Sequence, residues 1–136
     1  MEKLLTDNCD ARTVSTAALA FVGDAVFGLL AREKLCCTHS LPASKPHSSV
    51  VSVVRCEAQA RAVEHIMPDL SEEEKAVFLR GRNSHSSHVP KKSAVADYRM
   101  ATGLEALFGY IYLKGEIERL RELFGKVWDI LEGEKK

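Results

Sequence analysis

The chain has 136 residues, 46% of them hydrophobic, and its 19 basic and 19 acidic side chains give a formal net charge of zero. This length fits a single domain over residues 1–136, with enough apolar content to bury a core without disulfides or metal. Balanced charge argues against a protein held to nucleic acid by bulk charge alone. No basic, apolar leader and no run of roughly 20 apolar residues is present. We therefore expect a soluble cytoplasmic domain that does not enter membranes.

The four cysteines do not follow a recognisable metal or disulfide spacing. They are Cys9, Cys36, Cys37 and Cys56, and two of them are adjacent. This spacing predicts reduced, buried thiols rather than a disulfide framework or a zinc ribbon. Cys36, Cys37 and His39 are a less favoured metal site, because adjacent cysteines cannot easily face one tetrahedral ion.

The first predicted helix runs from Val14 to Leu35, and Ser15 or Thr13 can cap its start. Its apolar residues recur with helical spacing and predict a broad buried face. They are Val14, Ala17, Ala18, Phe21, Val22, Ala25, Val26, Leu29 and Leu30.

A second helix is predicted from near Pro46 to Ile66, although its valines also allow a strand. The Ala58-Gln59-Ala60-Arg61-Ala62 segment and the absence of a hairpin turn favour the helix. A third helix should begin at Ser71, with Glu74 completing a capping box, and run to about Gly81.

Residues 82–93 lack an apolar period and predict an exposed connection. Two further helices are expected, from about Ala94 to Lys114 and from about Glu116 to Glu132. Trp128 belongs to the apolar stripe of the last helix and should lie in the core. The predicted fold class is all-α.

Two acidic residues stand inside apolar runs. Asp24 follows Leu19-Ala20-Phe21-Val22-Gly23, and Glu105 precedes Ala106-Leu107-Phe108. An ionised carboxylate removed from water costs several kcal/mol unless a cation, donors or a proton compensates it. Neither flank has a lysine or arginine one helical turn away. If the two helices face each other, the pair could hold a hard divalent cation such as Mg²⁺. Two separate acids, each balanced by an arginine or a backbone amide, are the alternative, and periodicity leaves both open.

Basic residues are concentrated between positions 75 and 100. This stretch contains six lysines and arginines, and its one acidic residue is Asp97. The basic residues include Arg80, Arg82, Lys91, Lys92 and Arg99. An exposed group of this kind could bind a phosphate backbone, although a solvated loop is the alternative. His85 and His88 in the connection fit solvent exposure better than metal ligation.

Taken together, the segments Leu19 to Val26 and Glu105 to Leu113 resemble the two acidic helices of the ribonuclease III catalytic domain. Further segments fit the mini-ribonuclease III branch, which lacks an appended double-stranded-RNA-binding domain. These segments are Lys45-Pro46, Ala58 to Ala60, Phe78 to Asn83, Val89 to Lys91 and Tyr98 to Tyr112.

The resemblance implies an all-helical homodimer that cleaves double-stranded RNA with Mg²⁺, for which Mn²⁺ could substitute. It implies that precursor large-subunit (23S) ribosomal RNA is cut to 5′-phosphate and 3′-hydroxyl ends, with a ribosomal protein as a candidate helper. By position, Asp24 and Glu105 take the catalytic and metal-binding roles, and Phe21 takes that of an interface aromatic. RNA affinity would then come from the basic residues Arg80 to Arg99.

Longer ribonuclease III enzymes carry further acids at the positions of Ala17, Ala20 and Thr102. Their absence here implies that water and RNA phosphate oxygens complete the metal shell. It also makes a noncatalytic RNA-binding dimer a rival interpretation. A helical bundle that binds only proteins is a third.

Overall fold

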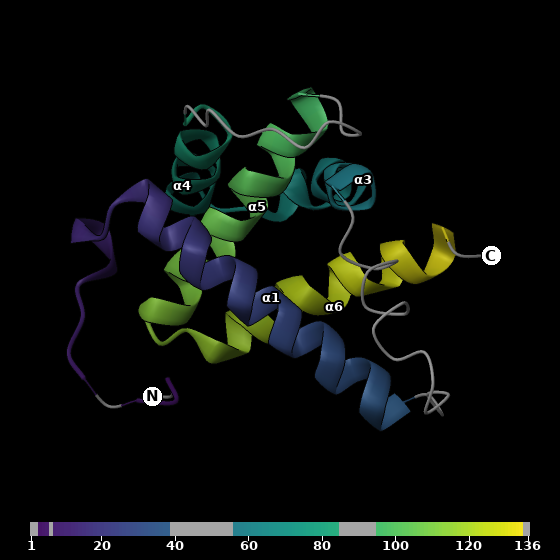
Figure 1. Cartoon of the computed structure of the whole chain (residues 1–136), viewed down its shortest axis with the longest axis horizontal. Helices are drawn as coiled ribbons and strands as arrows, with labels where there is room; N and C mark the ends of the chain where they lie inside the picture. Colours follow the sequence, from purple (N-terminus) through teal and green to yellow (C-terminus); the bar gives the residue numbers. More distant parts are fainter. Residues whose placement is uncertain (1–2, 6, 39–55, 85–94, 135–136) are drawn as a thin grey trace.

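The computed structural model describes residues 3–5, 7–38, 56–84 and 95–134, and every regular element in these ranges is helical (Figure 1). The predicted all-α class is therefore confirmed. The elements are η1 (Ala11–Thr13), α1 (Thr16–Thr38), α3 (Cys56–Ile66), η2 (Met67–Asp69), α4 (Glu72–Arg82), α5 (Val95–Leu113) and α6 (Ile117–Glu134).

Two predicted helix starts have the expected capping bonds. The Ser15 hydroxyl accepts a hydrogen bond from the Ala18 amide at 3.2 Å, at the start of α1. Ser71 and Glu74 form a complete capping box at the start of α4. Each cap satisfies amide groups that have no partner within the first helical turn. The predicted helix start near Pro46 and most of the connection over 82–93 lie outside the described residues.

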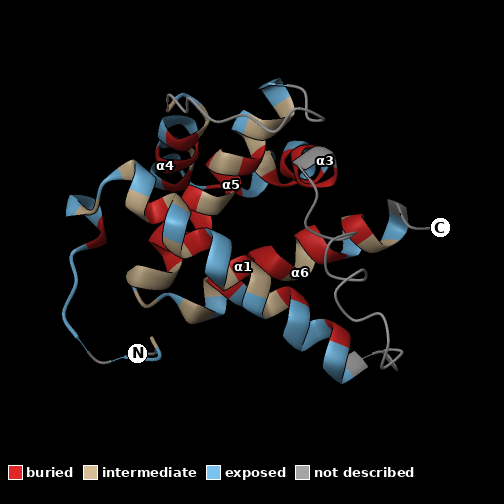
Figure 2. Cartoon of the chain, in the orientation of Figure 1, coloured by how far each residue is buried: buried red, intermediate tan, exposed pale blue. Residues whose placement is uncertain are grey.

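Helix α5 occupies the centre of the fold and packs against α1, α3, α4 and α6 (Figure 1). It is buried around most of its circumference, as expected for a helix with apolar residues on every side (Figure 2). Aromatic rings join α1, α5 and α6 in the core. The Phe27 ring centroid lies 5.6 Å from those of Phe108 and Phe124, and Phe124 lies 5.8 Å from Trp128. The predicted core position of Trp128 is confirmed, since it is 3% exposed.

The predicted buried face of α1 was wrong. Its buried residues are Leu19, Gly23, Phe27, Ala31 and Leu35, whereas the predicted set is exposed or half-buried throughout (Figure 2). Because α1 is apolar on most of its surface, spacing alone could not show which side faces α5. The close approach of the two helices at Gly23 determines which side of α1 is buried. The opposite apolar face of α1 is not covered by another part of the described protomer.

The cysteines also differ from expectation. Cys9, Cys36 and Cys37 are free thiols, as predicted, but they are exposed rather than buried. Cys36 and Cys37 lie near the end of α1, where the helix extends past the core (Figure 1). Among the described helices, none combines the length and the apolar character needed to cross a bilayer.

Candidate metal and RNA site

Helices α1 and α5 cross with their backbones almost in contact, and two glycines make this possible. A Cβ atom on Gly23 would lie 1.6 Å from the Glu105 carbonyl oxygen, and one on Gly109 would lie 2.0 Å from the Leu19 carbonyl oxygen. No side chain can occupy either position without forcing the helices apart. The crossing therefore fixes the register that places Asp24, the residue after Gly23, beside Glu105.

The structure brings the Asp24 and Glu105 side chains together. Glu105 is half-buried, whereas Asp24 is exposed in the protomer, contrary to the expectation that both are removed from water. Burial raises the pKa of Glu105 to about 8, with a hydrogen bond to Asp24 and the negative charge of Asp24 adding to the effect. At neutral pH Glu105 is therefore mostly protonated and donates this hydrogen bond to the Asp24 carboxylate.

Within the described ranges, no lysine or arginine forms an ion pair with Asp24 or Glu105. The proton on Glu105, rather than a lysine or arginine, therefore offsets the repulsion between the two acidic groups. Two oxygen donors of this kind, one of them open to water, suit a hard divalent cation that keeps several water ligands, such as Mg²⁺.

Further protein ligands are not evident near this pair. The described part of the chain has no group of three or more histidine, cysteine or acidic side chains that could surround a metal. Ala17 and Ala20 offer no donor atom, and the Thr102 hydroxyl donates to the Tyr98 carbonyl oxygen at 3.0 Å. Any cation held by Asp24 and Glu105 would thus be coordinated mainly by water and substrate.

The predicted RNA-binding residues lie partly within the described ranges. Arg80 and Arg99 are exposed on α4 and α5, Arg82 is half-buried at the end of α4, and Lys91 and Lys92 lie outside these ranges. Arg82 Nε donates to the Asn83 side-chain oxygen at 3.2 Å. None of the three arginines forms an ion pair with another described residue, unlike Arg12, Lys114, Arg119, Arg121 and Lys126.

A third glycine contact brings the end of α4 close to the acidic pair. A Cβ atom on Gly81 would lie 2.9 Å from the Gly103 Cα and 3.2 Å from the Thr102 carbonyl oxygen. Gly81 stands between Arg80 and Arg82, and Gly103 is two residues before Glu105. The end of α4, with its two arginines, is therefore anchored next to the α5 turn that precedes Glu105.

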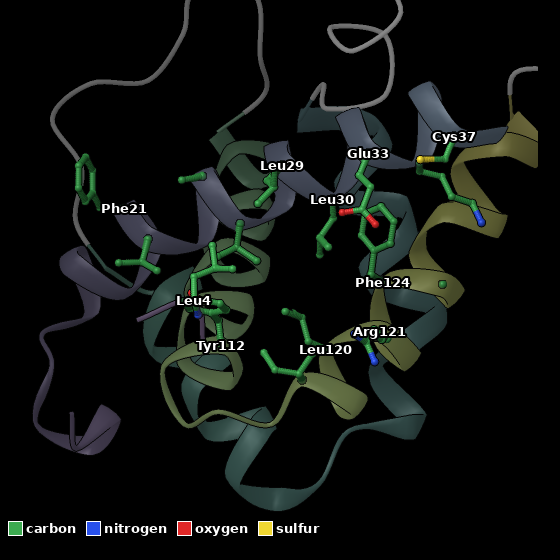
Figure 3. A pocket seen from close by; sticks show the side chains of 16 residues that line it. Leu4, Phe21, Leu29, Leu30, Glu33, Cys37, Tyr112, Leu120, Arg121 and Phe124 are labelled. Carbon is green, nitrogen blue, oxygen red and sulfur yellow. The ribbon is translucent and has the colours of Figure 1, made fainter. Parts of the chain in front are cut away.

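An apolar groove of about 820 Å³ lies between α1 and α6, on the open side of α1. Leu30, Leu120 and Phe124 point into it, and Phe21 projects from α1 at its edge (Figure 3). Phe21 is 81% exposed, the highest exposure among the large apolar side chains of the described ranges. One face of the protomer thus carries both an apolar cavity and a projecting aromatic ring.

Sequence reasoning missed two parts of this site. It gave no role to Gly23 and Gly109, although a glycine inside an apolar helix is a recognisable signal of close backbone approach. It also missed the groove, because the wrong face of α1 was assigned to the core. Apolar residues on nearly the whole circumference of α1 could have indicated two contact faces.

Comparisons with known proteins show the family to which the chain belongs. Residues 17–116 match the ribonuclease III domain family. The chain is 46% identical over 111 residues to Mini-ribonuclease 3 of a Thermoanaerobacter species, covering 82% of this chain and 78% of that protein. It is 38% identical over 125 residues to Mini-ribonuclease 3 of Brevibacillus brevis, covering 92% and 93%.

The fold matches a crystal structure of a protein from Fusobacterium nucleatum with a TM-score of 0.78 and 29% sequence identity. That match covers 86% of this chain and 96% of the other. On these similarities, the chain belongs to the ribonuclease III family of endoribonucleases and, within it, to the Mini-ribonuclease 3 group.

Proposed function

We propose that this endoribonuclease hydrolyses double-stranded RNA with Mg²⁺, and that Asp24 and Glu105 are its catalytic metal ligands. The observation that carries the proposal is the contact between these two carboxyl groups at the α1–α5 crossing, with no lysine or arginine of the described ranges paired to either. Such a pair does not stabilise the fold at neutral pH, because burial and the charge of Asp24 both disfavour the ionised form of Glu105.

The two acids have different tasks in this mechanism. Glu105 must lose its proton before it can act as a ligand, and the exposed Asp24 keeps the site open to water and to the RNA strand. Bound Mg²⁺ would supply Lewis-acid chemistry, favouring hydroxide formation and offsetting charge on the phosphoryl oxygens. Water oxygen attacks phosphorus in line while the bond to the 3′ oxygen breaks. The products carry a 5′-phosphate and a 3′-hydroxyl.

RNA binding is assigned to the arginines at the end of α4 and the start of α5, with the predicted Lys91 and Lys92 between them in sequence. Support comes from the lack of carboxylate partners for Arg80, Arg82 and Arg99 within the described ranges, since their charges remain available to phosphates. The anchoring of Gly81 against α5 supports their proximity to Asp24 and Glu105. Recognition by duplex shape is expected, because side chains cannot read the narrow major groove of A-form RNA.

The proposed enzyme is a homodimer in which Phe21 enters the α1–α6 groove of a second copy. A two-fold interface must be self-complementary, and this face carries a projecting ring beside an apolar cavity. Its lining also includes both Glu33 and Arg121, so opposite charges are available on the same surface. A dimer with one cleavage site per subunit would suit a duplex, whose two strands both need cutting.

Three finer parts of the proposal depend on the resemblance to mini-ribonuclease III alone. They are precursor 23S ribosomal RNA as the substrate, a cytoplasmic location, and assistance by a ribosomal protein.

Incubation of the purified chain with long duplex RNA, with and without Mg²⁺, tests the proposal. We expect cleavage only with Mg²⁺, and no comparable cleavage of single-stranded RNA of the same sequence. Duplex binding without cleavage under any divalent metal would instead favour a noncatalytic RNA-binding protein. Failure to retain duplex RNA at moderate salt would favour a protein-interaction bundle.

A further inference from the structure

One arginine outside the predicted basic segment lies on the same helix as Asp24, about two turns or roughly 12 Å further along α1. Asp24, Gly28 and Arg32 are spaced four residues apart, so they follow one another along neighbouring turns of the helix. Arg32 is exposed, and its Nη1 donates a hydrogen bond to the Gly28 carbonyl oxygen at 3.1 Å. The guanidinium therefore folds back along the helix towards Asp24, and the bonded carbonyl is about 6 Å from Asp24 along the axis.

Gly28 makes this position available. A Cβ atom at residue 28 would lie 2.8 Å from Arg32 Nη1, which is too close for a real contact. Because this contact is with the end of a flexible side chain, a larger residue would displace the guanidinium rather than unfold the helix. The glycine thus leaves room for a cation between Asp24 and the next turns of α1.

The charge of Arg32 is not used by the fold. Within the described ranges it forms no ion pair, whereas Arg12, Arg119 and Arg121 each contact a carboxylate. One hydrogen bond to Gly28 occupies a single donor of a guanidinium that has five. The remaining donors face solvent and can bind an anion in a bidentate manner.

We propose that Arg32 is a phosphate-binding residue that holds the RNA strand beside the scissile phosphate, and that Gly28 sets the position of its guanidinium. This proposal rests on the proposed function, because it takes RNA as the ligand and Asp24 as part of the cleavage site. Arg32 then extends the cationic surface from α4 and α5 onto α1, so that the acidic pair has cations on two sides.

The test measures duplex RNA affinity at several salt concentrations, in Ca²⁺ to suppress cleavage, for the wild type and for Arg32→Gln. We expect binding to weaken on the order of fivefold and the slope of log affinity against log salt to fall by about one. Lys126→Gln is the matched control for charge, since Lys126 on α6 pairs with Asp69 of η2 and with Glu122 of α6, and its slope should equal that of the wild type. Arg32→Lys keeps the charge and should restore most of the slope.

Gly28→Ala tests position separately from charge. Alanine is the best helix former, so the variant should keep its thermal stability while its guanidinium is displaced. We expect weaker duplex binding than in the wild type with no change in dimerisation. Affinity equal to the wild type would overturn the role assigned to Gly28.

Two results would overturn the assignment of Arg32. One is an unchanged salt slope in Arg32→Gln with wild-type cleavage, which would leave the proposed function intact. The other is weaker self-association in Arg32→Gln with unchanged RNA affinity per dimer, which would make Arg32 a protein contact. If the wild type itself neither binds nor cuts duplex RNA, the proposed function fails as well.

Discussion

Two glutamates, Glu74 and Glu105, are both withdrawn from solvent, and the fold treats them in opposite ways. Glu74 is 6% exposed, and its carboxylate receives two hydrogen bonds from Arg119, each at 2.8 Å, as well as one from the Ser71 amide. Hydrogen bonds from Arg119 therefore lower the pKa of Glu74. Glu105 instead meets another acid, Asp24, and its pKa is raised.

The difference separates a structural carboxylate from one for which we propose a metal-binding role. Glu74 has a permanent cation and caps α4, so its charge is satisfied within the protomer. The charge of Glu105 is instead removed by a bound proton, because no cation of the described ranges pairs with it. A site of this kind would gain stabilisation if a divalent cation replaced the proton, and the contrast therefore supports the proposal that the α1–α5 crossing is the catalytic site.

The largest expected effect comes from removing either acid of the pair. Asp24→Asn and Glu105→Gln should each lower Mg²⁺-dependent cleavage of duplex RNA by a factor of about a thousand or more, equivalent to roughly 4 kcal/mol of transition-state stabilisation. Duplex binding should change little. Glu122→Gln on α6 provides a control acid outside the site. Cleavage near the wild-type rate in both site variants would remove these residues from the mechanism.

Arg119→Met should reduce the stability of the fold rather than the cleavage rate. It leaves the buried Glu74 carboxylate without its cation, at a cost of about 3 kcal/mol in unfolding free energy, while cleavage per folded molecule stays near the wild-type value. Urea denaturation at pH 7.5 measures the loss. A stability equal to that of the wild type would show that the Glu74–Arg119 pair contributes nothing net.

At pH 7.5, Glu105→Gln should raise the unfolding free energy of the metal-free protein by about 1 to 3 kcal/mol. Because the folded-state pKa is raised above the ordinary value of 4.5, the contribution of Glu105 is fully present below pH 4.5 and is lost as pH rises to about 8. The difference in unfolding free energy between Glu105→Gln and the wild type should therefore increase from pH 4.5 to about 8 and stay constant at higher pH.

Glu74 gives the opposite pH dependence. Its lowered pKa means that its contribution is present above pH 4.5 and is lost as pH falls through the folded-state value. Denaturation curves collected in EDTA from below pH 4.5 up to pH 8.5 separate the two glutamates, because the Glu74 contribution changes below pH 4.5 and the Glu105 contribution above it. A pH-independent difference between the wild type and Glu105→Gln would contradict the raised pKa.

The smallest expected effect extends the comparison to the two apolar faces of α1. Phe27 is 3% exposed and packs between Phe108 and Phe124, whereas Phe21, six residues earlier, is 81% exposed. Phe21→Ser should weaken self-association by about tenfold or more, as for an aromatic anchor at an interface. Leu5→Ser is the control, since Leu5 is 69% exposed but does not line the groove. Sedimentation equilibrium that shows equal association for both variants would place the interface elsewhere.

Much of the fold could be predicted from sequence because the signals were local. The Ser71 and Glu74 capping box, the Ser15 cap and the apolar stripe with Trp128 depend on neighbours a few residues away. The all-α class followed from these elements. Helix faces were harder, since α1 is apolar on most sides and its orientation depends on the distant Gly109.

The acidic pair could be selected from sequence, but its chemistry could not. An acid inside an apolar run shows where a carboxylate is out of place, yet the burial of Glu105 and the exposure of Asp24 depend on how two distant helices cross. The open groove and the position of Arg32 depend in the same way on tertiary packing and on missing side chains at glycines.

Calorimetric titration of Mg²⁺ into the metal-free protein at pH 7.5, in two buffers of different ionisation enthalpy, tests the central claim most directly. Cation binding at Asp24 and Glu105 must displace the Glu105 proton, so the wild type should release up to about one proton per cation bound and Glu105→Gln should release none. Binding with the same affinity and no proton release in both proteins would contradict the claim that this pair is the metal site.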